Sequence, residues 1–120
     1  MDLRERMDRF DKSDLYVVIT EAFCGERTAV DVLDACLEAG VRLVQFREKN
    51  FGARELYARA CLFRERTRRA GALLIVNDRV DLALAVEADG VHLGQDDLPF
   101  EAARRIAPEL LLGASSHDPE

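Results

Sequence analysis

Residues 15–20 read Leu-Tyr-Val-Val-Ile-Thr, a short run that is apolar at nearly every position and rich in β-branched side chains. Strands buried on both faces have this pattern, and such strands occur mainly in parallel sheets. Similar runs begin at residues 41, 73, 90 and 110, with helical patterns between them. Strands that alternate with helices form right-handed βαβ units around a parallel sheet. We therefore expect an α/β fold, either a (β/α)8 barrel or a doubly wound sheet, and periodicity alone does not choose between these two.

Glycines and proline at the ends of the apolar patterns give approximate element boundaries. Gly40 and Gly71 are expected to close two of the helices. The predicted strands are Leu15–Thr20, Val41–Phe46, Leu73–Val76, Gly90–Leu93 and Leu110–Ala114. The predicted helices are an apolar stripe from Val30 to Ala39, then Ala53–Ala70, Asp81–Ala88 and Pro99–Ala107.

The chain is short for a complete barrel. A (β/α)8 barrel needs about 200 residues or more, so 120 residues hold only about four and a half βα units. We therefore expect residues 15–120 to form the N-terminal half of a TIM-type barrel. Residues 1–14 precede it as a separate segment, where Leu3, Met7 and Phe10 share one face of a short amphipathic helix.

Composition excludes several classes of protein. The net charge of −6 argues against a broad basic surface for nucleic acid or anionic membrane. Three irregularly spaced cysteines, at positions 24, 36 and 61, suit neither a disulfide framework nor a zinc site, so we expect reduced thiols. Residues 1–14 contain no apolar signal-peptide core, and no apolar run approaches the length of a membrane span. These features predict a cytoplasmic protein.

The strongest candidate site follows the second predicted strand. Side chains alternate between the two faces of a strand, so Gln45, Arg47 and Lys49 project together while Phe46 and Glu48 point away. An amide, a guanidinium and an ammonium group on one face suit a phosphate or diphosphate. They also lie at the carboxyl end of the strand, where barrel active sites form. A solvated strand end with ordinary ion pairs is the alternative.

Carboxylates follow the third and fourth predicted strands. Mg²⁺ prefers oxygen ligands and binds one or two carboxylates together with substrate phosphates and water. Asp78 and Asp97 can supply such a pair, although Asp78 is also placed to cap the helix predicted at 81–88. Asp96 competes with Asp97 for the same role, and sequence patterns do not choose between them.

The fifth predicted strand leads into Ser115 and Ser116, which place hydroxyls beside backbone N–H groups at an expected helix start. This arrangement favours an anion site. His92 and His117 are candidate bases, but no acid and base align with either serine to indicate a serine hydrolase. No dinucleotide-binding or P-loop glycine pattern is present.

Together these segments resemble the thiamine phosphate synthase family. The resemblance rests on LYVVIT at 15–20, VRLVQFREK at 41–49, LLIVNDRVDLAL at 73–84, ADGVHLGQDDLP at 88–99 and LLGASSH at 111–117. It implies a Mg²⁺-dependent transferase of thiamine biosynthesis that joins a pyrimidine diphosphate to a thiazole phosphate and releases diphosphate.

The resemblance also implies a role for each candidate residue. Gln45, Arg47 and Lys49 look like the residues that hold the pyrimidine diphosphate, with Arg47 and Lys49 neutralising the leaving diphosphate. Asp78 and Asp97 match the two Mg²⁺ carboxylates, which favours Asp97 over Asp96. Asn77 and Ser115 match residues that contact the substrate.

Two other functions stay open. The related thiazole tautomerase shares the barrel and a G-x-S-x-H segment, although an isomerase acting on one monophosphate needs no diphosphate and metal clamp. A non-catalytic half-barrel that serves as a binding or assembly module is the other. A half-barrel exposes two sheet edges, so we expect either a homo-oligomer or a C-terminal half that completes the site.

Overall fold

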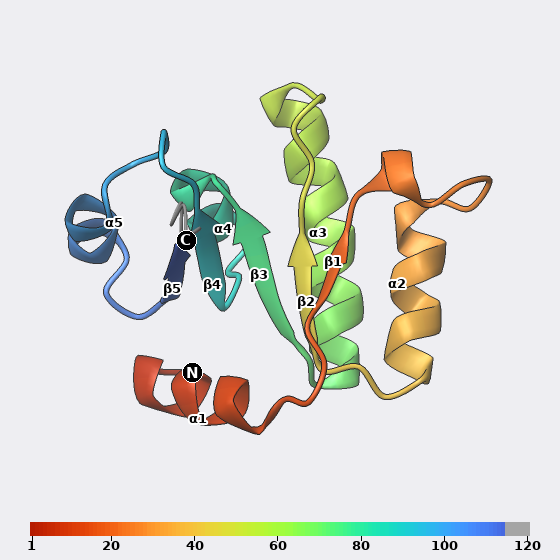
Figure 1. The fold of residues 1–120 in the computed structure, drawn as a ribbon, viewed down its shortest axis with the longest axis horizontal. Coiled ribbons are helices and arrows are strands. Elements are labelled where there is room, and N and C mark those ends of the chain that lie inside the picture. The colour runs from red at the N-terminus through yellow and green to blue at the C-terminus, as the bar shows by residue number, and fades with distance from the viewer. Residues whose placement is uncertain (115–120) are drawn as a thin grey trace, which may run out of the picture.

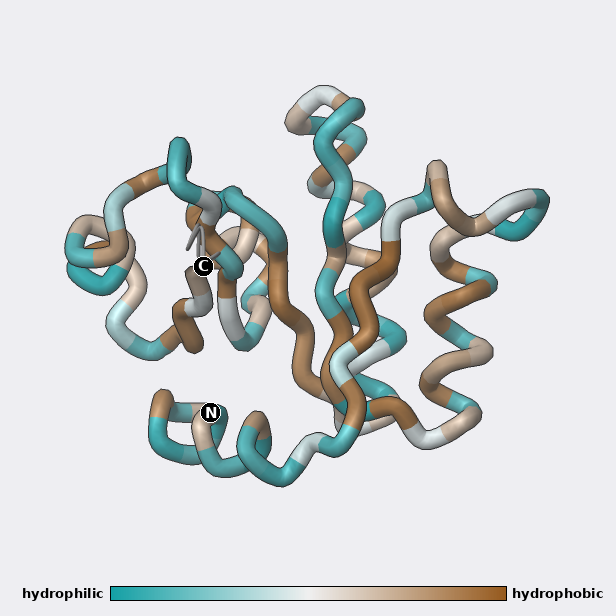
Figure 2. Tube along the Cα trace, viewed as in Figure 1, coloured by the Kyte–Doolittle hydropathy of each residue, from teal (hydrophilic) through white to brown (hydrophobic). Residues whose placement is uncertain are grey.

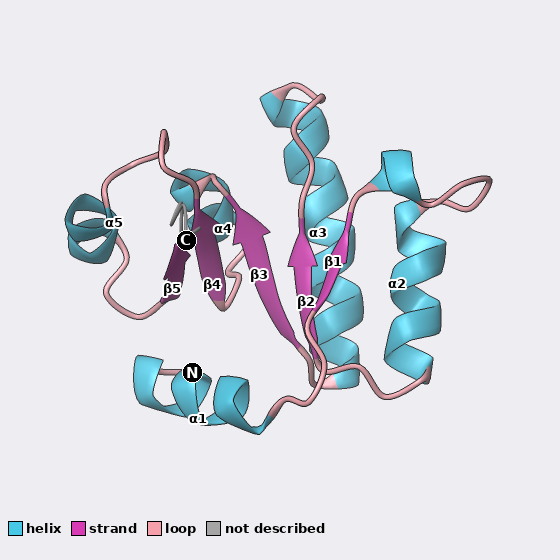
Figure 3. Cartoon of the chain, viewed as in Figure 1, coloured by secondary structure: helices cyan, strands magenta, loops and turns pink. Residues whose placement is uncertain are grey.

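The computed structural model describes residues 1–114 as a parallel sheet with helices packed around it (Figures 1 and 3). The strands are β1 (Val17–Ile19), β2 (Leu43–Phe46), β3 (Leu73–Asn77), β4 (Gly90–Leu93) and β5 (Leu111–Ala114). The helices are α1 (Leu3–Lys12), the short 3₁₀ helix η1 (Glu21–Phe23), α2 (Ala29–Glu38), α3 (Ala53–Ala70), α4 (Val80–Ala85) and α5 (Phe100–Ile106). The predicted alternation of strands and helices is therefore confirmed.

The order of the strands resolves the choice that periodicity left open. Within the described residues the sheet runs β1-β2-β3-β4-β5, and each strand pairs in parallel with the next one along the chain. A doubly wound sheet instead reverses its strand order at a switch point. A strictly sequential parallel order is that of a barrel wall, in which all carboxyl ends of the strands meet at one rim.

The main core lies between the sheet and the helices that cover its outer face. Phe46 of β2 is only 2% exposed and packs edge-on against Phe63 of α3, with 5.0 Å between the ring centroids. Leu33 of α2 and Val44 of β2 are fully buried in the same cluster. Burying a side chain of this size contributes about 1.5–3 kcal/mol, so this interface supplies much of the stabilisation of the half-barrel.

Local backbone geometry explains where two of the helices end, one at the predicted residue and one earlier. α3 ends at Gly71 as expected, because Gly71 adopts φ 73° and its N–H and that of Ala72 bond back to the last turn. α4 ends at Ala85 and does not reach Ala88. Glu87 adopts a positive φ of 58°, which a continuing helix does not allow.

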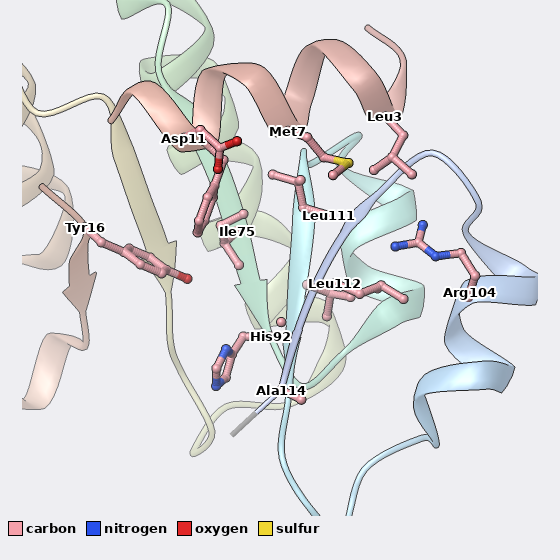
Figure 4. A pocket seen from close by; sticks show the side chains of 13 residues that line it. Leu3, Met7, Asp11, Tyr16, Ile75, His92, Arg104, Leu111, Leu112 and Ala114 are labelled. Atoms are coloured by element: carbon pink, nitrogen blue, oxygen red, sulfur yellow. The ribbon is translucent and has the colours of Figure 1, made fainter. Parts of the chain in front are cut away.

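The helix α1 lies across the amino-terminal ends of the strands (Figure 1). Its apolar residues Leu3, Met7 and Phe10 border a cavity of about 440 Å³ whose other wall includes Ile75 and Leu111 on the inner face of the sheet (Figure 4). Next to this cavity, Leu43 of β2 and Leu73 and Ile75 of β3 form a second, smaller apolar cluster, and Ile75 also lines the cavity. α1 thus covers one end of the inner face.

A buried ion network fastens α1 to the sheet. Arg6 of α1 donates to one oxygen of Asp89 at 3.1 Å, and Arg64 of α3 donates to the other at 3.0 Å. The second oxygen of Asp89 also accepts from the backbone N–H of Leu74 at 2.9 Å. All three charged side chains are at least 88% buried, so each depends on its partners for the hydrogen bonds that water would otherwise supply.

Polarity changes along the strands. Figure 2 shows apolar strand segments followed by hydrophilic chain at the upper end of β3 and β2.

The three cysteines are free thiols, as predicted. Within residues 1–114, no helix combines the length and the apolarity that crossing a bilayer requires.

Candidate functional site

A polar cleft of about 520 Å³ lies at the carboxyl ends of β1 to β4. Parallel strands deliver the residues that follow them to the same rim, so side chains far apart in the sequence meet here. Six of the seven residues that the sequence singled out line this cleft, namely Gln45, Arg47, Lys49, Asn77, Asp78 and Asp97. The seventh, Ser115, lies outside the described residues, as do Ser116 and His117.

The alternation predicted for the end of β2 is present. Phe46 points outward into the helix-covered core, whereas Gln45 on the opposite face is buried beneath the cleft. The side-chain amide of Gln45 donates to the hydroxyl of Tyr16 at 2.9 Å. Partial burial of the Tyr16 side chain raises its pKa above the ordinary value, and the hydrogen bond with Gln45 acts in the opposite direction. The phenol is therefore neutral and fixed in orientation.

Lys49 and Asp78 approach each other across the cleft from neighbouring loops. The Lys49 ammonium lies 3.2 Å from Asp78 Oδ2, and the Lys49 side chain is 54% exposed. Asp78 adopts a left-handed backbone with φ 71°, and its N–H donates to the carbonyl of His92 at 2.7 Å. A positive φ is uncommon outside glycine and clusters at functional sites, where surrounding contacts maintain it.

Asp97 joins Asp78 from the following loop. Its Oδ2 accepts from the backbone N–H of Gly94 at 2.6 Å. The pKa of Asp78 is raised, first by burial and then by the neighbouring Asp97 carboxyl, while Lys49 acts in the opposite direction. Two carboxylates that share a site in this way favour a cation between them or a shared proton.

Gly94 leaves room for the two carboxylates in their present positions. A Cβ atom added to Gly94 would lie 2.9 Å from Asp97 Oδ2 and 3.8 Å from Asp78 Oδ1. Real Cβ atoms do not approach an oxygen so closely, so any larger residue would displace the Asp97 carboxylate. The small residue therefore permits the two acidic side chains to meet.

The helix-capping role considered for Asp78 does not hold, and Asp97 does not cap a helix either. The N-cap of α4 is Arg79 and that of α5 is Pro99, and neither makes a side-chain capping hydrogen bond. Asp78 and Asp97 therefore turn towards the cleft and cap neither helix. Asp96 also borders the cleft, but its side chain is exposed, and Asp97 is the residue that contacts Asp78.

Asn77 and His92 lie side by side at the ends of β3 and β4, where they pair in register. Asn77 is 7% exposed, and its side-chain nitrogen has no hydrogen-bond partner in the described part of the protein. Unsatisfied buried amides are rare and call for a partner such as a ligand or water. The imidazole of His92 lies so close to Gly113 that a Cβ there would be 3.1 Å from Nδ1.

Sequence reasoning missed Tyr16 as a site residue and left the role of His92 open. Both residues border the polar cleft, and both also line the apolar cavity shown in Figure 4. Tyr16 lies two residues before Val18, so the two side chains share one face. Val18 pairs in register with Gln45, and this pairing was the signal that could have placed Tyr16 on the same face as Gln45. In residues 1–114, no three His, Cys, Asp or Glu side chains gather in a group able to hold a metal by themselves.

Comparison with known proteins decides the family. Residues 15–120 match the thiamine monophosphate synthase family over their whole length. The chain belongs to this family. A thiamine-phosphate synthase of Moorella thermoacetica is 51% identical over 104 residues, which cover 86% of this chain and 50% of that protein. The bifunctional thiamine biosynthesis protein ThiM/ThiE of Symbiobacterium thermophilum is 54% identical over 106 residues, which cover 88% of this chain and 21% of that protein.

A solved structure supports the barrel architecture of this thiamine monophosphate synthase family member. The thiamine phosphate pyrophosphorylase of Pyrococcus furiosus superposes with a TM-score of 0.79 at 44% identity. The match covers 86% of this chain and 50% of that one. The predicted TIM-barrel type of fold is thus confirmed, and the chain spans about half the length of that structure and of the Moorella relative.

Proposed function

We propose that this chain carries the pyrimidine diphosphate and metal site of a thiamine-phosphate synthase. The proposed reaction joins 4-amino-2-methyl-5-hydroxymethylpyrimidine diphosphate to thiazole phosphate and releases diphosphate. The single observation that supports it most is the convergence of Arg47, Lys49, Asp78 and Asp97 on one cleft at the carboxyl rim of the sheet. Membership of the thiamine monophosphate synthase family supports this chemistry for the cleft.

The residues present fit a magnesium ion. Asp78 and Asp97 bring two carboxylates together, and burial with mutual repulsion raises the pKa of Asp78. A divalent cation relieves that repulsion, and Mg²⁺ typically takes one or two protein carboxylates while phosphate oxygens and water fill its other positions. We therefore assign Asp78 and Asp97 as its protein ligands. Bound there, Mg²⁺ would supply charge neutralisation for a diphosphate.

Arg47 and Lys49 would bind the diphosphate from the other side of the cleft. Loss of diphosphate from the methylene carbon leaves negative charge on the departing group, and fixed cations stabilise that charge as it develops. Arg47 can bind two phosphate oxygens at once, whereas Lys49 acts as a point charge. We propose Gln45, Asn77 and Ser115 as contacts to the substrate, and the unpartnered buried amide nitrogen of Asn77 supports its part in this.

Further βα units would complete the barrel around this site. β1 and β5 are the two edges of the described sheet, and the inner-face residues Tyr16 and Val18 are 41% and 49% exposed. Unpaired edges and exposed apolar side chains favour pairing with more strands. We propose that a C-terminal half or a second copy supplies them. A cytoplasmic location is also proposed, and the three free thiols support it.

An assay of the purified chain tests the proposal. Both substrates are supplied with Mg²⁺ or with an excess of chelator, and thiamine phosphate is quantified. Where further βα units complete the barrel, we expect turnover in Mg²⁺, and we expect excess chelator to abolish it. Turnover of a thiazole tautomer without Mg²⁺ would instead identify an isomerase. Binding of the pyrimidine diphosphate without any turnover would identify a non-catalytic half-barrel.

A further inference from the structure

The loop from Arg47 to Gly52, between β2 and α3, carries both cations of the cleft and is held at several points along its length. At its start, the N–H of Arg47 donates to the carbonyl of Ile19 at 3.1 Å. The carbonyl of Arg47 accepts from the hydroxyl of Thr20 at 2.8 Å. Both peptide groups of Arg47 are thus fixed to the end of β1, and its side chain remains directed to the cleft.

Glu48 holds the middle of the loop. It lies between Arg47 and Lys49 in the sequence and points away from the cleft, as alternation predicts. Its Oε2 accepts from the backbone N–H of Glu21, the first residue of η1, at 2.7 Å. A hydrogen bond to a carboxylate is shorter and stronger than one between neutral groups. The peptide segment from which both cations extend is therefore attached to a neighbouring element.

Glu21 connects this attachment to the far end of the loop. Its Oε1 accepts from the N–H of Ala29 at 2.9 Å and lies 3.2 Å from the guanidinium of Arg59. The hydrogen bond from Ala29 is the main reason that the pKa of Glu21 is lowered, and it keeps the carboxylate charged. Arg59 in turn covers the ring of Phe51 at 4.0 Å from its centroid. Contacts from Glu48 through Glu21 and Arg59 to Phe51 thus link the middle of the loop to its far end.

We propose that Glu48 is a positioning residue that places Arg47 and Lys49 for a diphosphate ligand, with Thr20 and Glu21 as its supports. Two flexible cationic side chains bind an anion well only when the backbone that carries them is already ordered, because ordering costs affinity. Glu48 provides that order without lining the cleft. This inference rests on the proposed function for the identity of the ligand only.

Three substitutions separate positioning from a general loss of charge. Glu48→Ala removes the acceptor for the Glu21 N–H, whereas Glu48→Gln keeps a side-chain oxygen at the same place. Glu65→Ala is the matched control, because Glu65 is a half-exposed glutamate of α3 whose ion-pair partners within residues 1–114 are Arg66 and Arg69. If Glu48→Ala does not fold, Thr20→Val with Thr20→Ser as its rescue tests the same attachment at Arg47.

The decisive readout is the backbone order of residues 48–51 in the ligand-free chain, measured by ¹⁵N relaxation. We expect Glu48→Ala to lower the order parameters of this loop below about 0.6, while Glu48→Gln and Glu65→Ala leave them near those of the parent chain. Loop amides that stay as rigid in Glu48→Ala as in Glu65→Ala would overturn the inference. This outcome does not depend on whether the chain binds diphosphate.

Affinity for inorganic diphosphate in the presence of Mg²⁺ gives the second readout. We expect Glu48→Ala to weaken binding about tenfold and Glu48→Gln to restore it, because small displacements of a preorganised site cost this much or more. The unfolding temperature should stay close to that of Glu65→Ala. A parent chain that binds no diphosphate would contradict the proposed function. A parent that binds while Glu48→Ala binds equally well would contradict the positioning role alone.

Discussion

The ammonium group of Lys49 lies 3.2 Å from a carboxylate oxygen of Asp78, although the two residues follow different strands. Lys49 follows β2 and Asp78 follows β3. These two strands pair in parallel, so their carboxyl ends lie at the same rim of the sheet. The pair is half in solvent, so its contribution to folding is small. Its significance is spatial, since it brings a candidate phosphate-binding cation beside a candidate metal ligand.

Removing the charge of Lys49 should weaken catalysis through the substrate diphosphate. We expect Lys49→Ala to lower kcat/KM for the pyrimidine diphosphate about 100-fold, because a fixed cation then no longer stabilises the leaving group. The chain contains only one other lysine, Lys12, which is exposed on α1 and pairs with Asp8. Lys12→Ala is therefore a matched control and should keep full activity. Equal losses in both variants would count against the assignment.

Removing either candidate metal ligand should weaken the binding of magnesium. We expect Asp78→Asn and Asp97→Asn each to lower activity about 100-fold or more and to raise the Mg²⁺ concentration needed for half-maximal rate. Asp81→Asn changes a nearby aspartate that pairs with Arg79 and lies outside the cleft. The magnesium titration of that control should match the parent. If Asp97→Asn and Asp81→Asn behave alike, Asp97 is not a ligand.

A single methyl group at Gly94 should disturb the metal site without unfolding the chain. The added Cβ would lie 2.9 Å from Asp97 Oδ2, so the carboxylate must move. We expect Gly94→Ala to weaken Mg²⁺ binding about tenfold or more, as is usual when a group that orients a ligand is changed. At Gly52, an added Cβ meets nothing within 4 Å, which makes Gly52→Ala the control. Isothermal titration would measure the Mg²⁺ affinity of both variants. An affinity of Gly94→Ala equal to that of the parent chain would contradict the placement of Asp97 in the metal site.

The buried network around Asp89 should dominate the attachment of α1. Asp89→Ala removes the carboxylate that Arg6, Arg64 and the N–H of Leu74 share, and within the described residues the two guanidinium groups keep only backbone carbonyls as acceptors. Breaking a buried charge network costs about 3–5 kcal/mol. The free energy of unfolding, measured with urea, should fall by that amount. Asp8→Ala removes an exposed aspartate of α1 and should change stability little. A small effect at Asp89 would show that α1 is held mainly by its other contacts, which are its apolar packing and its hydrogen bonds to Glu109.

Much of the fold and of the cleft followed from side-chain alternation and the direction of the strands. The sequence predicted that Gln45 of β2 and Arg47 and Lys49, which follow this strand, project to one side, and that Asp78 lies at the same rim. In a parallel sheet these positions follow from the alternation of side chains and the direction of the strands. The family resemblance, not the periodicity, led to Asp97. The structure adds its contact with Asp78.

Other features depend on tertiary contacts that no local pattern contains. The predicted first strand began at Leu15, but β1 begins at Val17, and both Leu15 and Tyr16 are exposed at the sheet edge. The left-handed backbone of Asp78 is maintained by its bond to His92 on the next strand. The order of the strands is likewise a property of pairing, which helical and strand periods do not reveal.

Equilibrium binding of the pyrimidine diphosphate to the purified chain tests the central assignment most directly, because it needs no thiazole site. Isothermal titration would compare the parent chain in Mg²⁺, the parent in excess chelator and Asp78→Asn in Mg²⁺. We expect saturable binding near one ligand per chain in Mg²⁺, lost both with chelator and in Asp78→Asn. Binding that is equally tight in all three would contradict a diphosphate and metal site built from Lys49, Asp78 and Asp97.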